Sequence, residues 1–159
     1  MRPTRTRWML SSILLAAAGA ILIIAGLYFL LLRPALLPED IRYMQLAPAE
    51  LAAVRPRLEA WLAHVFRVMG GYVLATGVLT VTLAATAFRA HYRAAVIGAR
   101  IGGAASIGLM AGVNFAIGSD FRWMLLAMAL LWGASLVVYG FEAGPLRQDT
   151  GGRRLHVRG

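Results

Sequence analysis

Four stretches of the chain are long and apolar enough to cross a bilayer, and this pattern constrains the fold more than any other feature. They lie at about residues 8–32, 68–88, 94–117 and 121–141. A transmembrane helix needs about 20 predominantly apolar residues. The whole chain is 60% hydrophobic, above the roughly half that soluble domains contain. We therefore predict an all-α polytopic membrane protein with a single membrane domain over residues 8–143.

The first apolar stretch competes with a signal peptide, because Ala16, Ala17 and Ala18 resemble a small-residue cleavage site. The apolar core of a signal peptide is about 7–15 residues long. This stretch runs without a charge from Trp8 to Leu32. We therefore predict an uncleaved first span, preceded by a basic arm at residues 1–7.

The segment at 33–67 is the only long connection, and its prolines predict short helices. Proline suits the first turn of a helix and cannot continue the helix before it. We expect one helix to begin at Pro48 and a second at Pro56. Leu58, Trp61 and Leu62 then recur at helical spacing. The second helix is therefore expected to lie on the outer leaflet of the membrane, or to stack over the mouth of the bundle, and to lead into the second span.

The remaining connections, at residues 89–93 and 118–120, are short and place consecutive spans antiparallel. The expected architecture is an up-down four-helix bundle with a helical external loop between the first and second spans. Residues 144–159 are rich in glycine and arginine. They offer little to bury, so a disordered basic tail is expected.

Arginine sets the predicted orientation. The formal net charge is +9, and all 16 basic residues are arginines. Nine lie in the two termini and the 89–93 turn, and those of the 33–67 loop are largely offset by acids. The positive-inside rule then places both termini in the cytoplasm of a multi-pass protein of the bacterial inner (plasma) membrane. Because the charges flank apolar spans, we expect them to contact anionic lipid headgroups and no nucleic acid.

The third span has the most unusual composition. One broad face of the predicted helix gathers small residues, including two GxxxG pairs. Small residues let helix backbones approach closely, which is a main source of helix association in lipid. The opposite face carries Arg100 and Asn114, so we expect this span inside the bundle with protein on both sides. The predicted packing interface consists of Gly98, Gly102, Ala105, Gly108 and Gly112.

Four polar residues are candidates for a polar or headgroup site: His64, Arg67, Arg100 and Asn114. Arg100 lies inside a span, where an ionisable group suggests function. It can reach back to lipid phosphate, pair with Glu142, or bind a substrate anion. His64 and Arg67 can line a pocket for an anionic or quinone-like headgroup, or simply anchor the helix. Asn114 and the threonines of the second span are expected to form hydrogen bonds between helices.

Missing residue types exclude several functions. Without cysteine the chain has no disulfide, thiolate metal site or thiol chemistry. The predicted spans contain no acid, the usual carrier in proton-coupled transport. The dispersed histidines give no metal-ligand spacing. We therefore predict no catalytic residues, no metal and no cofactor.

One segment resembles a known family. Leu51, Pro56-Arg57-Leu58, His64, Gly70-Gly71 and Gly77 are similar, in that order, to the loop and second helix of small uncharacterised bacterial four-helix inner-membrane proteins. The resemblance covers about Leu46 to Leu79. In that family an acid often follows the histidine, whereas this chain has Val65. The resemblance implies the fold and no particular activity.

The function expected from these observations is that of a non-enzymatic accessory or scaffolding subunit. It would pack in a larger membrane complex or with itself through its small-residue surface. Two alternatives remain open. One is a small carrier or channel for an anionic or amphipathic solute, and the other is a lipid- or quinone-binding membrane protein.

Overall fold

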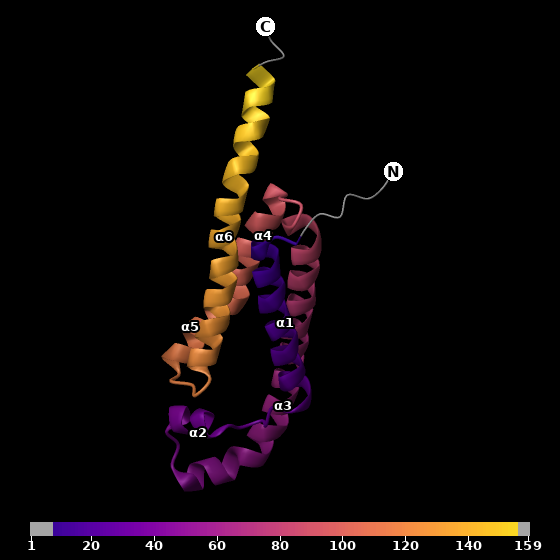
Figure 1. Ribbon diagram of the computed structural model, residues 1–159. Coiled ribbons are helices and arrows are strands. Elements are labelled where there is room, and N and C mark those ends of the chain that lie inside the picture. Colours follow the sequence, from indigo (N-terminus) through magenta and orange to yellow (C-terminus); the bar gives the residue numbers. More distant parts are fainter. Residues whose placement is uncertain (1–7, 156–159) are drawn as a thin grey trace.

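The computed structural model describes residues 8–143 and is helical, without a strand in this range. Figure 1 shows how the helices follow one another. In chain order they are α1 (Leu10–Leu31), α2 (Pro38–Met44), α3 (Pro48–Leu83), the π-helical turn η1 (Ala84–Phe88), α4 (Arg93–Gly103), the π-helical turn η2 (Ala104–Gly108), α5 (Leu109–Ala116) and α6 (Arg122–Leu155). The all-helical prediction is confirmed over the described residues.

Four helical segments of the described chain are long and apolar enough to cross a membrane, as the hydropathy pattern predicts. They are Leu10–Leu31, Pro48–Phe88, Arg93–Ala116 and Arg122–Ala143. The basic arm at 1–7 lies outside the described residues. So does the tail at 144–159 that was predicted to be disordered.

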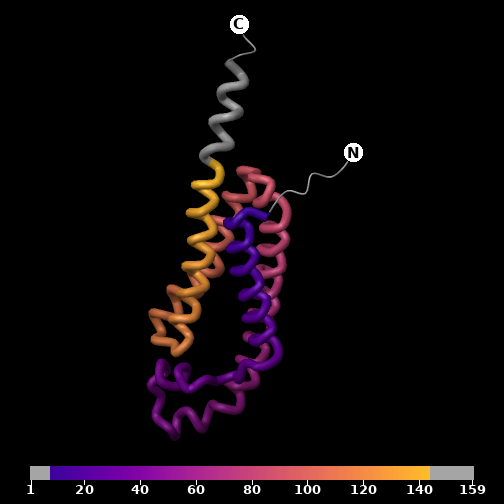
Figure 2. The backbone as a smooth tube through the Cα atoms, in the orientation of Figure 1, coloured from indigo at the N-terminus to yellow at the C-terminus, as the bar shows by residue number. Residues whose placement is uncertain are grey.

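The four long segments alternate in direction (Figure 1). α1 runs from the end of the bundle that carries Trp8 towards α2, and α3 runs back. The third segment, made of α4, η2 and α5, runs towards α2 again, and α6 returns. The tube in Figure 2 follows the same course. We call the two ends of the bundle the Trp8 end and the α2 end.

The tightest helix pair is α1 with α3, and four glycines form its seam. They are Gly19 and Gly26 on α1 and Gly70 and Gly77 on α3, all buried. A Cβ atom built on Gly26 would lie 2.5 Å from the backbone nitrogen of Leu74, and one on Gly77 would lie 2.7 Å from that of Ile23. Only glycine allows backbones this close.

α1 is therefore the central helix of the fold. It packs against α3 on one side and against α6 on another. One core cluster joins Leu15 of α1 to Phe88, Val96 and Tyr139. A second joins Leu22 of α1 to residues of η2, α5 and α6, namely Ile107, Ala111, Leu125 and Met128. The prediction that the third span lies inside the bundle with protein on both sides is wrong, because α4, η2 and α5 pack mainly against α6, whereas α1 packs against both α3 and α6.

α3 is longer than predicted. It begins at Pro48, as the sequence indicates, but runs unbroken to Leu83 and carries Pro56 in its interior. The prediction that a separate helix begins at Pro56 is wrong. Figure 1 shows that the first part of α3 lies crosswise under the bundle before the helix bends upward. An interior proline favours such a bend, because it removes one backbone hydrogen bond and crowds the preceding turn.

Polar contacts fasten α2 to the rest of the molecule. The Arg33 guanidinium forms an ion pair with Asp40 at 3.1 Å and lies 3.4 Å from the centre of the Phe66 ring. The buried Glu39 accepts a hydrogen bond from the Ser119 hydroxyl at 3.2 Å. The segment between α1 and α3 thus packs against the turn between α5 and α6, which the sequence did not reveal.

Polar side chains within the helices bond to their own backbone. The Thr80 hydroxyl donates to the Thr76 carbonyl oxygen at 2.8 Å, and the Asn114 amide donates to the Met110 carbonyl oxygen at 2.8 Å. Thr76, Thr82 and Thr86 repeat this pattern. The prediction of hydrogen bonds between helices is wrong for these groups. Each hydroxyl or amide instead donates to the backbone carbonyl oxygen four residues earlier in its own helix.

Candidate functional site

The described part of the chain contains a groove between α3 and α4, with a volume of about 200 Å³. All four long segments contribute to its lining. Its residues are Leu15, Thr76, Leu79, Thr80, Leu83, Gly98, Ala99, Gly102, Gly103, Ile107 and Trp132. The groove exists because α3 and α4 make few contacts along their lengths, although they are consecutive long helices in the chain.

The rim of the groove includes two of the five residues of the predicted small-residue interface, Gly98 and Gly102. Gly98 and Gly102 are exposed, and a Cβ atom at either position would meet nothing within 4 Å. Gly112 is equally open, and Gly108 would meet only the Gly103 carbonyl oxygen of its own helix. The prediction that this face is packed inside the bundle is wrong, since Ala105 is exposed as well.

The floor of the groove holds the one glycine of the third segment that packs tightly. A Cβ atom on Gly103 would lie 2.1 Å from the indole of Trp132. The indole nitrogen Nε1 donates a hydrogen bond to the Ala99 carbonyl oxygen at 3.1 Å. Trp132 therefore binds α6 to α4 and closes the groove on the inner side. The sequence shows Gly103 but does not reveal its partner.

Just below this contact the third segment contains the π-helical turn η2. A π-turn inserts one residue and rotates the helix that follows. A helical wheel for an uninterrupted α-helix places Gly98, Gly102 and Gly112 on one face. That placement fails here, because Gly98 and Gly102 precede the π-helical turn and Gly112 follows it. No residue pattern in this segment indicates the π-helical turn.

Arg100 is exposed on α4. Ion pairs in the described residues join Arg33 to Asp40, Arg42 to Asp120 and Arg55 to Glu59. Arg100 belongs to none of them. The alternative in which it pairs with Glu142 is wrong, because that carboxylate accepts hydrogen bonds from the Ser11 hydroxyl and, at 3.3 Å, from the Ser11 backbone N–H. Glu142 thus caps the first turn of α1.

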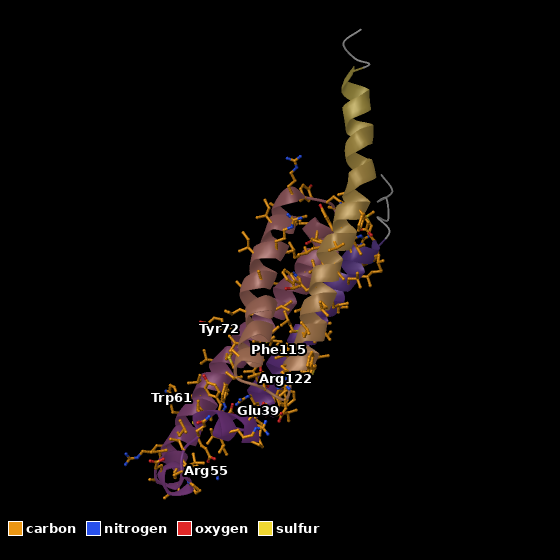
Figure 3. All side chains as sticks on the ribbon, turned by 90° about the vertical axis from the view of Figure 1, so that its left-hand side faces the viewer. Glu39, Arg55, Trp61, Tyr72, Phe115 and Arg122 are labelled. Atoms are coloured by element: carbon orange, nitrogen blue, oxygen red, sulfur yellow. The ribbon has the colours of Figure 1, made fainter. Side chains whose placement is uncertain are left out.

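The four predicted polar residues do not form one site. His64 and Arg67 are exposed on α3. The neighbouring Trp61 and Tyr72 are 62% and 73% exposed and lie on the outward side of α3 (Figure 3). Arg100 lies on α4, nearer the Trp8 end, and none of the four lines the groove.

A polar cluster that sequence reasoning missed lies at the Trp8 end. His91 has a left-handed backbone, with φ 59°. Its Nε2 lies 2.8 Å from the Met9 sulfur, and its ring lies 4.7 Å from that of Tyr139. The Ser12 hydroxyl, in the first turn of α1, is also buried. The cluster lacks a hydrogen bond from a serine to the histidine within the described residues, so it does not form a nucleophile–base pair.

Metal-ligating side chains are dispersed in this structure. No three His, Asp or Glu residues of the described chain come close enough to hold one ion. The groove is lined mainly by apolar side chains, and the two threonines on its wall bond to their own backbone. This arrangement can hold an apolar side chain or hydrocarbon chain.

Comparison with known proteins gives no relative: the chain matches no family model, no curated protein and no solved structure.

Proposed function

We propose that this protein is a non-enzymatic accessory or scaffolding subunit of the bacterial inner membrane. It crosses the membrane four times with both termini in the cytoplasm. It binds a helix of a partner subunit, or of a second copy, at the groove between α3 and α4. The observation that carries this proposal is the open glycine rim formed by Gly98 and Gly102.

The physical reason is the weakness of the hydrophobic effect in lipid. Lipid chains are as apolar as leucine, so helices associate through close packing of small residues instead. In this chain the buried glycines already serve the α1–α3 pair, and the rim glycines have no partner in the described residues. A bare backbone strip beside a groove is the surface that a partner helix can approach most closely.

A second candidate function follows from the same groove. Its walls are mainly apolar, so it can hold a segment of an acyl or isoprenoid chain. This would make the protein a lipid- or quinone-binding membrane protein. The two functions differ in what remains bound after purification, which is a polypeptide in one case and a lipid in the other.

The test is a double substitution, Gly98→Leu with Gly102→Leu, which fills the rim. Both positions are open, so the folded monomer should keep its thermal stability in detergent. Binding of a copurifying subunit, or self-association measured by crosslinking in native membranes, should be lost. The matched control is Gly140→Leu on α6, where a side chain also meets nothing within 4 Å.

If the double variant keeps the same partner or the same oligomer as the wild type, the scaffolding proposal is refuted. If no polypeptide binds the wild type, but a lipid or quinone extracted from it is missing from the double variant, the second candidate replaces it.

A further inference from the structure

Two arginines lie on one side of α4. Arg93 and Arg100 are seven residues apart, which is a rotation of about 700°, or 20° short of two full turns. Both are exposed. Ile97 and Ile101 fall on the same side and are 56% and 66% exposed. The outer face of α4 is therefore both basic and apolar.

This positive charge has no neutralising partner in the described residues. Neither arginine belongs to an ion pair there. The acid that the sequence offers, Glu142, is occupied by the N-terminus of α1. A charged arginine within a span costs several kcal/mol unless a polar group meets it. The missing counter-charge must therefore come from outside the described chain.

The position of the two arginines indicates what supplies it. Arg93 begins α4 beside the exposed Tyr92, and the neighbouring Arg89 lies 5.1 Å from the ring of Trp8. Aromatic residues of this kind gather at the level of the lipid headgroups. Arg100 lies about 10 Å farther along the helix, at 1.5 Å per residue. The pair thus spans the boundary between headgroups and acyl chains.

We propose that the outer face of α4 binds an anionic phospholipid. Its phosphate sits between the guanidinium groups of Arg93 and Arg100, and an acyl chain lies along Ile97 and Ile101. Guanidinium groups bind phosphate oxygens through paired, charge-assisted hydrogen bonds. The exposed isoleucines favour a lipid over a soluble anion, because a free phosphate has nothing to place against them.

This site is separate from the groove. Gly98 and Gly102 are each two residues from Arg100, about 200° around the helix. A phosphate bound between the two arginines therefore leaves Gly98 and Gly102 uncovered, and the two proposals can fail independently.

The experiment is native mass spectrometry of the purified chain in nonionic detergent, with added phosphatidylglycerol or phosphatidylcholine of matched acyl chains. The wild type should retain one phosphatidylglycerol and bind phosphatidylcholine more weakly. Arg93→Gln and Arg100→Gln should each weaken phosphatidylglycerol binding about fivefold, and Arg100→Lys should weaken it less. The control is Arg57→Gln, which removes an exposed arginine from α3 and should change nothing.

Arg100→Gln alters an exposed side chain, so the variant should keep its thermal stability. Arg93→Gln removes the second arginine of the same lipid site, at the first residue of α4. The proposal is overturned if the Arg57→Gln control weakens binding as much as either variant. Equal retention of the two lipids would also overturn it. So would displacement of the bound lipid by excess inorganic phosphate, which would show a general anion site.

Discussion

The glycine seam between α1 and α3 gives the most direct test of the fold. The perturbation is Gly26→Ala, which adds one methyl group. That group would lie 2.5 Å from the backbone nitrogen of Leu74, 2.7 Å from its Cα and 2.8 Å from its Cβ. None of these atoms can rotate away. Ordinary van der Waals contact begins at 3.4 Å, so α1 and α3 must separate by roughly 1 Å at this point, enough to lose a quarter to a half of each local contact energy.

The expected cost follows from this geometry. Overpacking a well-packed interface costs about 1–3 kcal/mol, and rigid obstacles favour the upper end. Alanine also raises helix propensity by about 1 kcal/mol over glycine. The control is Gly71→Ala, on the same helix as the seam, where a Cβ meets nothing within 4 Å. Both variants gain the same helix propensity. The difference between their free energies of unfolding, about 3 kcal/mol, therefore measures the cost of overpacking at Gly26.

The assay is thermal unfolding in detergent, followed by circular dichroism. At about 2–4 °C per kcal/mol, the Tm of Gly26→Ala should lie about 6–12 °C below that of Gly71→Ala. Gly70→Ala, whose Cβ would lie 2.9 Å from the Leu30 backbone nitrogen, should fall between them. Equal Tm values for Gly26→Ala and Gly71→Ala would refute the close approach of α1 and α3.

Two further predictions concern the groove and the orientation. Trp132→Phe keeps a ring against Gly103 but loses the hydrogen bond to the Ala99 carbonyl oxygen. This loss should cost about 1 kcal/mol of stability and lower Tm in the same assay. An unchanged Tm would show that the hydrogen bond contributes nothing to stability. Reporter fusions at Gly159 should be active only as cytoplasmic reporters, and fusions within 33–47 only as periplasmic ones. A periplasmic reporter active at Gly159 would reverse the proposed orientation.

Much of the fold could be predicted from the sequence because hydropathy and proline are local signals. A run of about 20 apolar residues defines a helix of spanning length whatever packs against it, and the four runs correspond to the four apolar helical segments. Pro48 begins α3 as its fixed φ angle favours. The prediction that a helix begins at Pro56 was wrong, because α3 continues through this proline with a bend instead of ending before it.

The candidate site could be predicted only in part. The glycines of the third span were visible in the sequence, and the structure leaves Gly98 and Gly102 open. Their neighbours were not visible, because the groove depends on α3 and α4 standing apart. The role of Glu142 was also hidden, since its partner Ser11 is 131 residues away in the chain.

The sequence by itself determined how many long apolar helices form and where small residues occur. Tertiary structure decided which glycines are used for packing: Gly26 and Gly77 lie in the seam, whereas Gly98 and Gly102 do not. A small residue only permits close approach. Which helix approaches depends on the register and crossing of two segments far apart in the chain, and no local pattern encodes that.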